Sequence, residues 1–274
     1  MLWAARRCLG LLDPRSGLRL VRLEGMNPAD VPDEDDQFLG CDLSEYFGSD
    51  RLATAERVVL TQLKYSVLHP GTRGTAARLN TSKRATGASV VKRLAQLFAR
   101  LGEEIDAEER LSKVTIALVS NQPIDPELEQ ALDAARGALR DRGPGTYAGI
   151  AFARLPVKRR DLLDKLRHAS GLSSGDFTDF VRVLDLGGCG AGTRLLQRLQ
   201  LGTELSALTP DGVQATPNLV QLMYSCMMPD AAGEAGLRAH DVLVALGASG
   251  PRSVLPFPPR VAEPAVRVLT RQAR

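Results

Sequence analysis

The run from Glu56 to Tyr65 constrains the fold of this chain more than any other segment. Its residues are mostly β-branched or apolar, which predicts a buried β-strand. Side chains two apart on a strand leave the same face of the sheet, so Gln62 and Lys64 are expected to point the same way near the end of this strand. An amide and an ammonium group at the end of a core strand make a candidate functional site.

A nearby acid adds to this pair. The segment from Gln37 to Asp42 predicts a shorter, neighbouring strand that ends in the aspartate. Mg²⁺ prefers oxygen ligands and keeps several waters, so Asp42 and the neutral carbonyl of Gln62, together with phosphate oxygens, are enough to hold it. A metal ion activates water, and Lys64 beside it can stabilise the charge of a transition state. The three residues therefore predict phosphodiester hydrolysis.

A second interpretation gives Asp42 a structural role only. Aspartate is favoured at the N-cap of a helix, and Glu45 stands at the capping-box position that follows it. In the same way, Gln62 and Lys64 are compatible with an edge strand whose polar residues are solvated.

The order of these residues resembles a known superfamily. Asp42 followed by Gln62-x-Lys64, with Glu24 on the preceding segment, is similar to the PD-(D/E)XK, restriction-endonuclease-like nucleases. The resemblance is strongest to the branch with Gly-x-Asp and Gln-x-Lys motifs, which includes Mrr-type and CD-NTase-associated antiphage nucleases. The chain departs from the general pattern because no proline precedes Asp42 and because Gln62 replaces the second acid.

Four short passages resemble the N-terminal region of bacterial STAND/NACHT-type defence proteins; these are Val21–Gly25, Gln62–Ser66, Val119–Pro123 and Val254–Pro259. In that family an NTP-binding domain follows, although this chain contains no GxxxxGK[ST] loop. Val254–Pro259 and the basic tail after it are typical of a linker, so we expect that the chain is part of a larger sensor protein.

The resemblance implies a metal-dependent DNA endonuclease, the effector part of an antiphage defence system. It implies that Asp42 and Gln62 bind Mg²⁺ or Mn²⁺, that Lys64 activates water, and that Glu24 assists. The implied substrate is double-stranded DNA, and the implied partners are an NTPase or sensor domain and further copies of the chain.

The distribution of charge also favours a polyanionic partner, although the net charge is only +3. Residues 24–50 contain nine acids and no Lys or Arg, whereas residues 51–101 contain ten basic residues and one acid, Glu56. A block of this sign is typical of phosphate contact. We expect Arg73, Lys83 and Arg84, in two short loop-like stretches, to contact DNA; the alternative is a solvated basic surface.

Periodicity predicts an α/β fold, with a restriction-endonuclease-like mixed sheet flanked by helices and then a small all-α domain. The expected order is helix, strands, helix, strand, helix. We expect a nuclease domain over residues 1–148, a helical coupling domain over 149–252 and a linker or tail over 253–274. The chain has no apolar run long enough to cross a bilayer, and Arg6 and Arg7 interrupt the apolar start, so we expect a cytoplasmic protein.

Two other functions stay open. The stretch Val183–Gly192 resembles the glycine-rich motif of S-adenosylmethionine-dependent methyltransferases, but an additional glycine breaks the usual spacing, and a turn between helices is the preferred interpretation. A catalytically idle module that binds DNA or protein is the third class. The four cysteines have no CxxC spacing and the three histidines share no motif, so neither a zinc site nor a His-based hydrolase is indicated.

Overall fold

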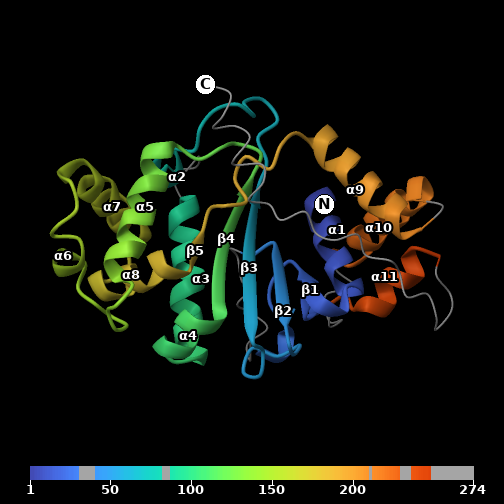
Figure 1. The fold of residues 1–274 in the computed structure, drawn as a ribbon, viewed down its shortest axis with the longest axis horizontal. Helices are drawn as coiled ribbons and strands as arrows, with labels where there is room; N and C mark the ends of the chain where they lie inside the picture. The colour runs from blue at the N-terminus through green and yellow to red at the C-terminus, as the bar shows by residue number, and fades with distance from the viewer. Residues whose placement is uncertain (31–40, 82–86, 210–211, 229–235, 248–274) are drawn as a thin grey trace.

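The computed structural model describes residues 1–30, 41–81, 87–209, 212–228 and 236–247. Within them the chain forms a mixed α/β fold around one five-stranded sheet (Figure 1). The strands are β1 (Leu18–Leu23), β2 (Leu43–Phe47), β3 (Arg57–Lys64), β4 (Val114–Ser120) and β5 (Leu184–Asp185). The described α-helices are α1 (Leu2–Cys8), α2 (Ala76–Asn80), α3 (Val90–Glu104), α4 (Ala107–Lys113), α5 (Pro126–Leu139), α6 (Ala148–Ala151), α7 (Val157–Ser170), α8 (Ser174–Val183), α9 (Arg194–Leu208), α10 (Gly212–Ser225) and α11 (Ala239–Ala245). Short 3₁₀ turns span Leu9–Leu12, Pro14–Ser16 and Pro28–Asp30.

The strands lie in the order β1-β2-β3-β4-β5. The first three form an antiparallel meander, and β4 and β5 then add in parallel. Parallel neighbours need a crossover connection, which α2–α4 provide between β3 and β4, and α5–α8 between β4 and β5. The expected order of helix, strands, helix, strand and helix is confirmed, as is the α/β class.

Helices cover both faces of the sheet (Figure 1). The strands β2 and β4 accordingly bury most of their side chains on both faces. On one face, Leu60 and Leu118 belong to a first core cluster with Phe98 of α3 and Phe180 of α8. On the other face, Leu43 and other residues of β1 and β2 form a second core cluster with α1, α9, α10 and α11.

Residues on both sides of the predicted boundary at 148/149 contribute to these clusters. Phe177 and Phe180 of α8 lie in the first, and Leu201 and Leu205 of α9 lie in the second beside Ala4 of α1. The described helices after residue 149 therefore pack on the same sheet as the segment before it. The domain boundaries themselves stay a prediction, and the tail over 253–274 lies outside the described residues.

Helix starts follow the chemistry of their caps. Ser89 accepts a hydrogen bond from the backbone N–H of Lys92 at the start of α3, and Asp125 accepts one from Glu127 at the start of α5, as expected for this residue. None of the helices within the described residues has both the length and the apolar character that crossing a bilayer requires.

Three expectations about elements need correction. Part of the predicted strand from Gln37 to Asp42 lies outside the described residues. The strand that forms here, β2, starts at Leu43, directly after the residue at which the predicted strand was expected to end. The helix that Asp42 was expected to cap in the alternative interpretation is absent, because Leu43–Phe47 pairs with strands on both sides. The periodicity of residues 175–186 predicts a helix over the whole stretch, but the helix ends at Val183, after which Leu184 and Asp185 pair with β4.

Candidate active site

Asp42, Gln62 and Glu24 lie together where β1, β2 and β3 meet. Leu43 pairs with Thr61, and Asp42 extends that ladder by donating its backbone N–H to the Thr61 carbonyl at 2.9 Å. One step along antiparallel strands places Asp42 beside Gln62. Oδ2 of Asp42 accepts a hydrogen bond of 2.6 Å from the Leu63 N–H, which fixes the carboxylate at this end of β3. Glu24 donates its N–H to the Asp42 carbonyl at 3.0 Å.

Gln62 is a buried polar residue with an unsatisfied oxygen. Its side chain is only 6 % exposed, and its Oε1 atom has no hydrogen-bond partner among the described residues. It leaves the sheet on the face of Leu60, and Lys64 follows on the same face, as predicted. Leaving a buried acceptor unpaired costs about 1–3 kcal/mol, and such groups are frequent at functional sites.

Glu24 closes the turn after β1 in a left-handed backbone conformation, with φ of 54°. This conformation is unusual for a residue other than glycine, and it is held by the hydrogen bond to Asp42. Its side chain is exposed, so the structure brings the backbone of Glu24 to the site more firmly than its carboxylate.

The charges around Asp42 differ from the sequence expectation. Burial raises the pKa of the Asp42 carboxyl, while the Leu63 N–H, the Arg93 guanidinium and the amino terminus oppose that rise. Burial also raises the pKa of the Cys189 thiol, to about 12, and the charge of Lys64 opposes that rise. Arg93 of α3 is therefore a cation near Asp42 that sequence reasoning assigned no role.

The helical spacing of the sequence indicates that Arg93 faces the sheet. Val90 and Leu97, one helical turn to either side of it, are both buried in the first core cluster. A basic residue at that spacing borders the apolar face of the helix and is carried towards the sheet.

The donor set fits a hard divalent cation held by few protein ligands. The described residues contain no group of three or more His, Cys, Asp or Glu side chains that could hold a metal ion. Mg²⁺ needs no such group, because one or two protein oxygens suffice when water and phosphate supply the others. The Asp42 carboxylate and the unpaired Oε1 of Gln62 are the oxygens that would hold it.

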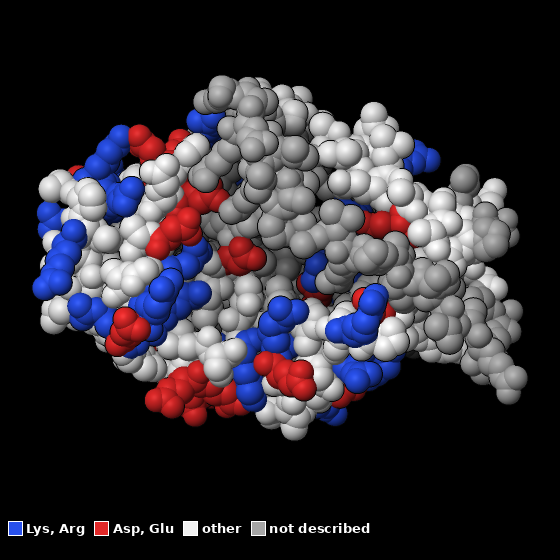
Figure 2. All heavy atoms as spheres, in the orientation of Figure 1, with Lys and Arg blue, Asp and Glu red and all other residues white. Residues whose placement is uncertain are grey.

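The predicted DNA-binding residues are only partly within the described structure. Arg73 is exposed, in the segment that follows β3, and Lys83 and Arg84 lie outside the described residues. On the face drawn in Figure 2, Lys and Arg side chains share the described surface with Asp and Glu. This face alone favours neither DNA contact nor its alternative.

The glycine-rich turn before α9 packs tightly against the end of β4. Gly188 accepts a hydrogen bond from the Ser120 N–H, and the N–H groups of Gly190 and Ala191 bond the carbonyls of Gln122 and Ser120. A Cβ atom on Gly188 would lie 2.6 Å from Cγ2 of Val119. These contacts give the turn a packing role and use N–H groups that a cofactor would need.

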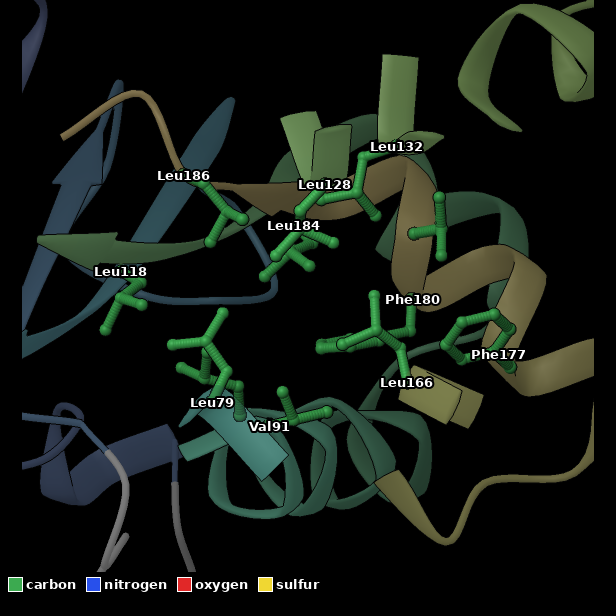
Figure 3. A pocket seen from close by; sticks show the side chains of 12 residues that line it. Leu79, Val91, Leu118, Leu128, Leu132, Leu166, Phe177, Phe180, Leu184 and Leu186 are labelled. Atoms are coloured by element: carbon green, nitrogen blue, oxygen red, sulfur yellow. The ribbon is translucent and has the colours of Figure 1, made fainter. Parts of the chain in front are cut away.

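Neither of two hollows elsewhere in the protein includes a residue of the predicted nuclease site, although residues 183–187 of the glycine-rich stretch line the second. Figure 3 shows the first, a cavity of about 10 Å³ inside the first core cluster, enclosed by apolar side chains from α3, α5, α8 and β5. A cavity of that size and lining is a packing defect rather than a binding site. The second, an open hollow of about 450 Å³ beside β5, is lined by Arg57, Arg136 and Asp185 among others.

Compared with known proteins, the chain matches no family model, and no curated protein sequence is similar enough to count as a relative.

Proposed function

We propose that this chain is a metal-dependent nuclease of the PD-(D/E)XK type that hydrolyses phosphodiester bonds of double-stranded DNA. The observation that carries the proposal is the position of Asp42 directly before β2, beside Gln62 and the end of β3 at which Lys64 lies. The order of elements, with an antiparallel meander followed by a parallel strand, supports it at the level of the fold.

The residues divide the chemistry between them. A divalent cation at Asp42 and Gln62 would neutralise charge on the phosphate and acidify a bound water. Asp42 is held in place for this by the Leu63 N–H, and Gln62 offers a buried oxygen that the protein does not satisfy. Lys64 has a long, half-buried side chain at the end of β3, from which its ammonium group can reach the attacking water or the phosphate. In this proposal Glu24 is an accessory acid. The proposed role of the chain as a whole is that of an effector in antiphage defence.

The test is cleavage of plasmid DNA by the purified protein with Mg²⁺ or Mn²⁺, with EDTA as a control. Lys64→Ala and Asp42→Asn should abolish nicking while thermal melting still shows a folded protein. Lys92→Ala is the matched control, because Lys92 is exposed on α3 and outside the site. Wild-type nicking by Lys64→Ala would show that the activity comes from another source. A protein that neither cleaves DNA nor binds it in a salt-sensitive manner would refute the proposal.

A second candidate, a catalytically idle module that binds another protein, is favoured by an exposed apolar surface. Val67 and Leu68 after β3 are 79 % and 82 % exposed, and Leu195 and Leu199 on α9 are 66 % and 59 % exposed. The two stretches are neighbours, because the Tyr65 hydroxyl accepts a hydrogen bond of 3.0 Å from the backbone N–H of Arg194. Light scattering with and without DNA would reveal association through this surface in the absence of cleavage.

A further inference from the structure

Val67 and Leu68 are held out in solvent by a loop that is fixed on both sides of them. Their side chains are 79 % and 82 % exposed. Before them, the Asn121 side chain bonds both backbone groups of Ser66: its Oδ1 accepts from the N–H and its Nδ2 donates to the carbonyl, each at 2.8 Å. After them, the carbonyl of the next residue accepts a hydrogen bond of 2.6 Å from Nε2 of Gln122. Both anchoring side chains are buried, so the core of the protein sets the position of this loop.

The two side chains belong to a larger apolar patch. Tyr65, before them on the chain, is 53 % exposed, and Leu195 and Leu199 of α9 are 66 % and 59 % exposed. The start of α9 adjoins the loop, because the Tyr65 hydroxyl accepts a hydrogen bond of 3.0 Å from the Arg194 N–H. Single exposed apolar residues are common, but a cluster on anchored backbone is typical of an interaction site.

The charge around the apolar patch is of one sign. Residues 57–102 and 186–203, which contain all of its members, include no Asp or Glu. Three arginines in these segments have exposed side chains; they are Arg73, Arg194 and Arg198. Cations without acids between them attract a polyanion and offer a protein partner few complementary groups. Charge complementarity therefore favours nucleic acid as the occupant of the patch.

The apolar patch also begins at the proposed nuclease site. Lys64 is the last residue of β3, and the loop starts at the residue after it. A DNA strand whose phosphate is bound at that site would bring its neighbouring bases towards the loop. Proteins that distort DNA insert apolar side chains such as leucine between base steps and unstack them. Unstacking costs least where a base is mismatched or already single-stranded, which is a source of selectivity.

We propose that Val67 and Leu68 insert between bases next to the phosphate that is cleaved, so that the preferred substrate is duplex DNA whose stacking a mismatch has weakened. This inference rests on the proposed nuclease function and names the substrate class of that site. The anchored loop suits the role, because little order has to be gained when the side chains insert. A mismatched duplex should be bound about tenfold more tightly than a matched one, since part of the unstacking cost is already met.

The test measures binding without turnover, by fluorescence anisotropy of labelled duplexes with Lys64→Ala protein. One duplex is fully matched and the other carries a single mismatch beside 2-aminopurine, a base whose fluorescence rises when it unstacks. The Lys64→Ala protein should prefer the mismatched duplex and raise this fluorescence. Adding Val67→Ser and Leu68→Ser should abolish both effects. Ile150→Ser with Val157→Ser is the matched control, because these side chains of α6 and α7 are 63 % and 62 % exposed and lie outside the patch.

Equal affinity of the Lys64→Ala protein for the two duplexes would overturn this inference alone, as would a preference that survives the two serine substitutions at the loop. If those substitutions instead abolish self-association, measured by light scattering, and leave the DNA preference unchanged, the patch is a protein interface and the inference fails. Absence of salt-sensitive binding to either duplex would overturn the proposed nuclease function together with the inference, which is a distinguishable result.

Discussion

The glycine-rich turn before α9 can be tested directly, because one of its glycines lies against a named methyl group. Gly188→Ala would place a Cβ 2.6 Å from Cγ2 of Val119 and 3.4 Å from the Leu118 carbonyl oxygen. Real Cβ atoms do not approach carbon this closely, so the turn or β4 must move. The movement would disturb the hydrogen bond between the Ser120 N–H and the Gly188 carbonyl, which joins the two segments at 3.3 Å.

The expected cost follows from the packing. Adding a methyl group to a well-packed contact costs about 1–3 kcal/mol in the free energy of unfolding. Val119 is buried, 6 % exposed, so Val119→Ala alone should cost about 1.5–3 kcal/mol through lost burial. Val119→Ala removes the methyl group with which the added Cβ of Gly188→Ala would clash. The double variant should therefore be more stable than the sum of the two effects by about 0.5–3 kcal/mol.

Urea denaturation followed by circular dichroism measures all four members of this cycle. Gly202→Ala is the control, because the Cβ added in the middle of α9 meets nothing within 4 Å and alanine favours a helix by up to about 1 kcal/mol. Additive effects of Gly188→Ala and Val119→Ala would refute the packing explanation. Loss of S-adenosylmethionine binding in Gly188→Ala, without loss of stability, would revive the methyltransferase interpretation.

Two more predictions concern buried groups. Glu45→Gln should lower the free energy of unfolding by about 1–3 kcal/mol, because Glu45 is 1 % exposed and its substitution removes the charge partner of the one-third exposed Arg7, 2.7 Å away. Urea denaturation would show this, and a loss below 1 kcal/mol, as for the surface pair of Lys158 and Glu127, would contradict it. Burial raises the pKa of the Cys41 thiol to about 12, so at pH 8 only about one thiol in ten thousand is ionised. Iodoacetamide should therefore label Cys41, as read by mass spectrometry, only after unfolding; rapid labelling of the native protein would contradict the structure.

Local patterns were sufficient for most elements of the fold. The apolar residues of Leu18–Leu23 are typical of a strand, which is what they form, and α3 begins after Ser89 because the Ser89 side chain caps it. Such elements carry their own signal, either an apolar period or a capping side chain, within a few residues.

The elements that were missed depend on partners far away in sequence. In β2, Ser44 and Glu45 are polar yet buried, and Ser44 finds its acceptor at the Gly25 carbonyl while Glu45 finds Arg7. The two residues of β5 are defined only by pairing with Ile116 and Ala117 of β4. The periodicity of one segment carries no information about contacts with residues that are distant in the sequence.

In the candidate site, too, the sequence predicts some of the neighbours and not others. The proximity of Asp42 and Gln62 follows from strand order and register, and was predicted from the pattern. The position of Arg93 depends on how α3 packs across the sheet, which no pattern within one segment specifies. The catalytic roles themselves stay a prediction.

The second core cluster has a consequence for how the protein is made on the ribosome. Arg6 of α1 contacts Glu204 of α9, which is 198 residues later, and Ala4 and Ala5 of α1 share that cluster with Leu201 and Leu205. At about 5–20 residues per second, translation needs roughly 10–40 s to deliver α9 after α1 has emerged. During that interval the apolar face of β1 and β2 has no helical cover from the C-terminal half. Nascent chains halted before α9 should therefore depend on chaperones, and slow synthesis should lower the yield of folded protein.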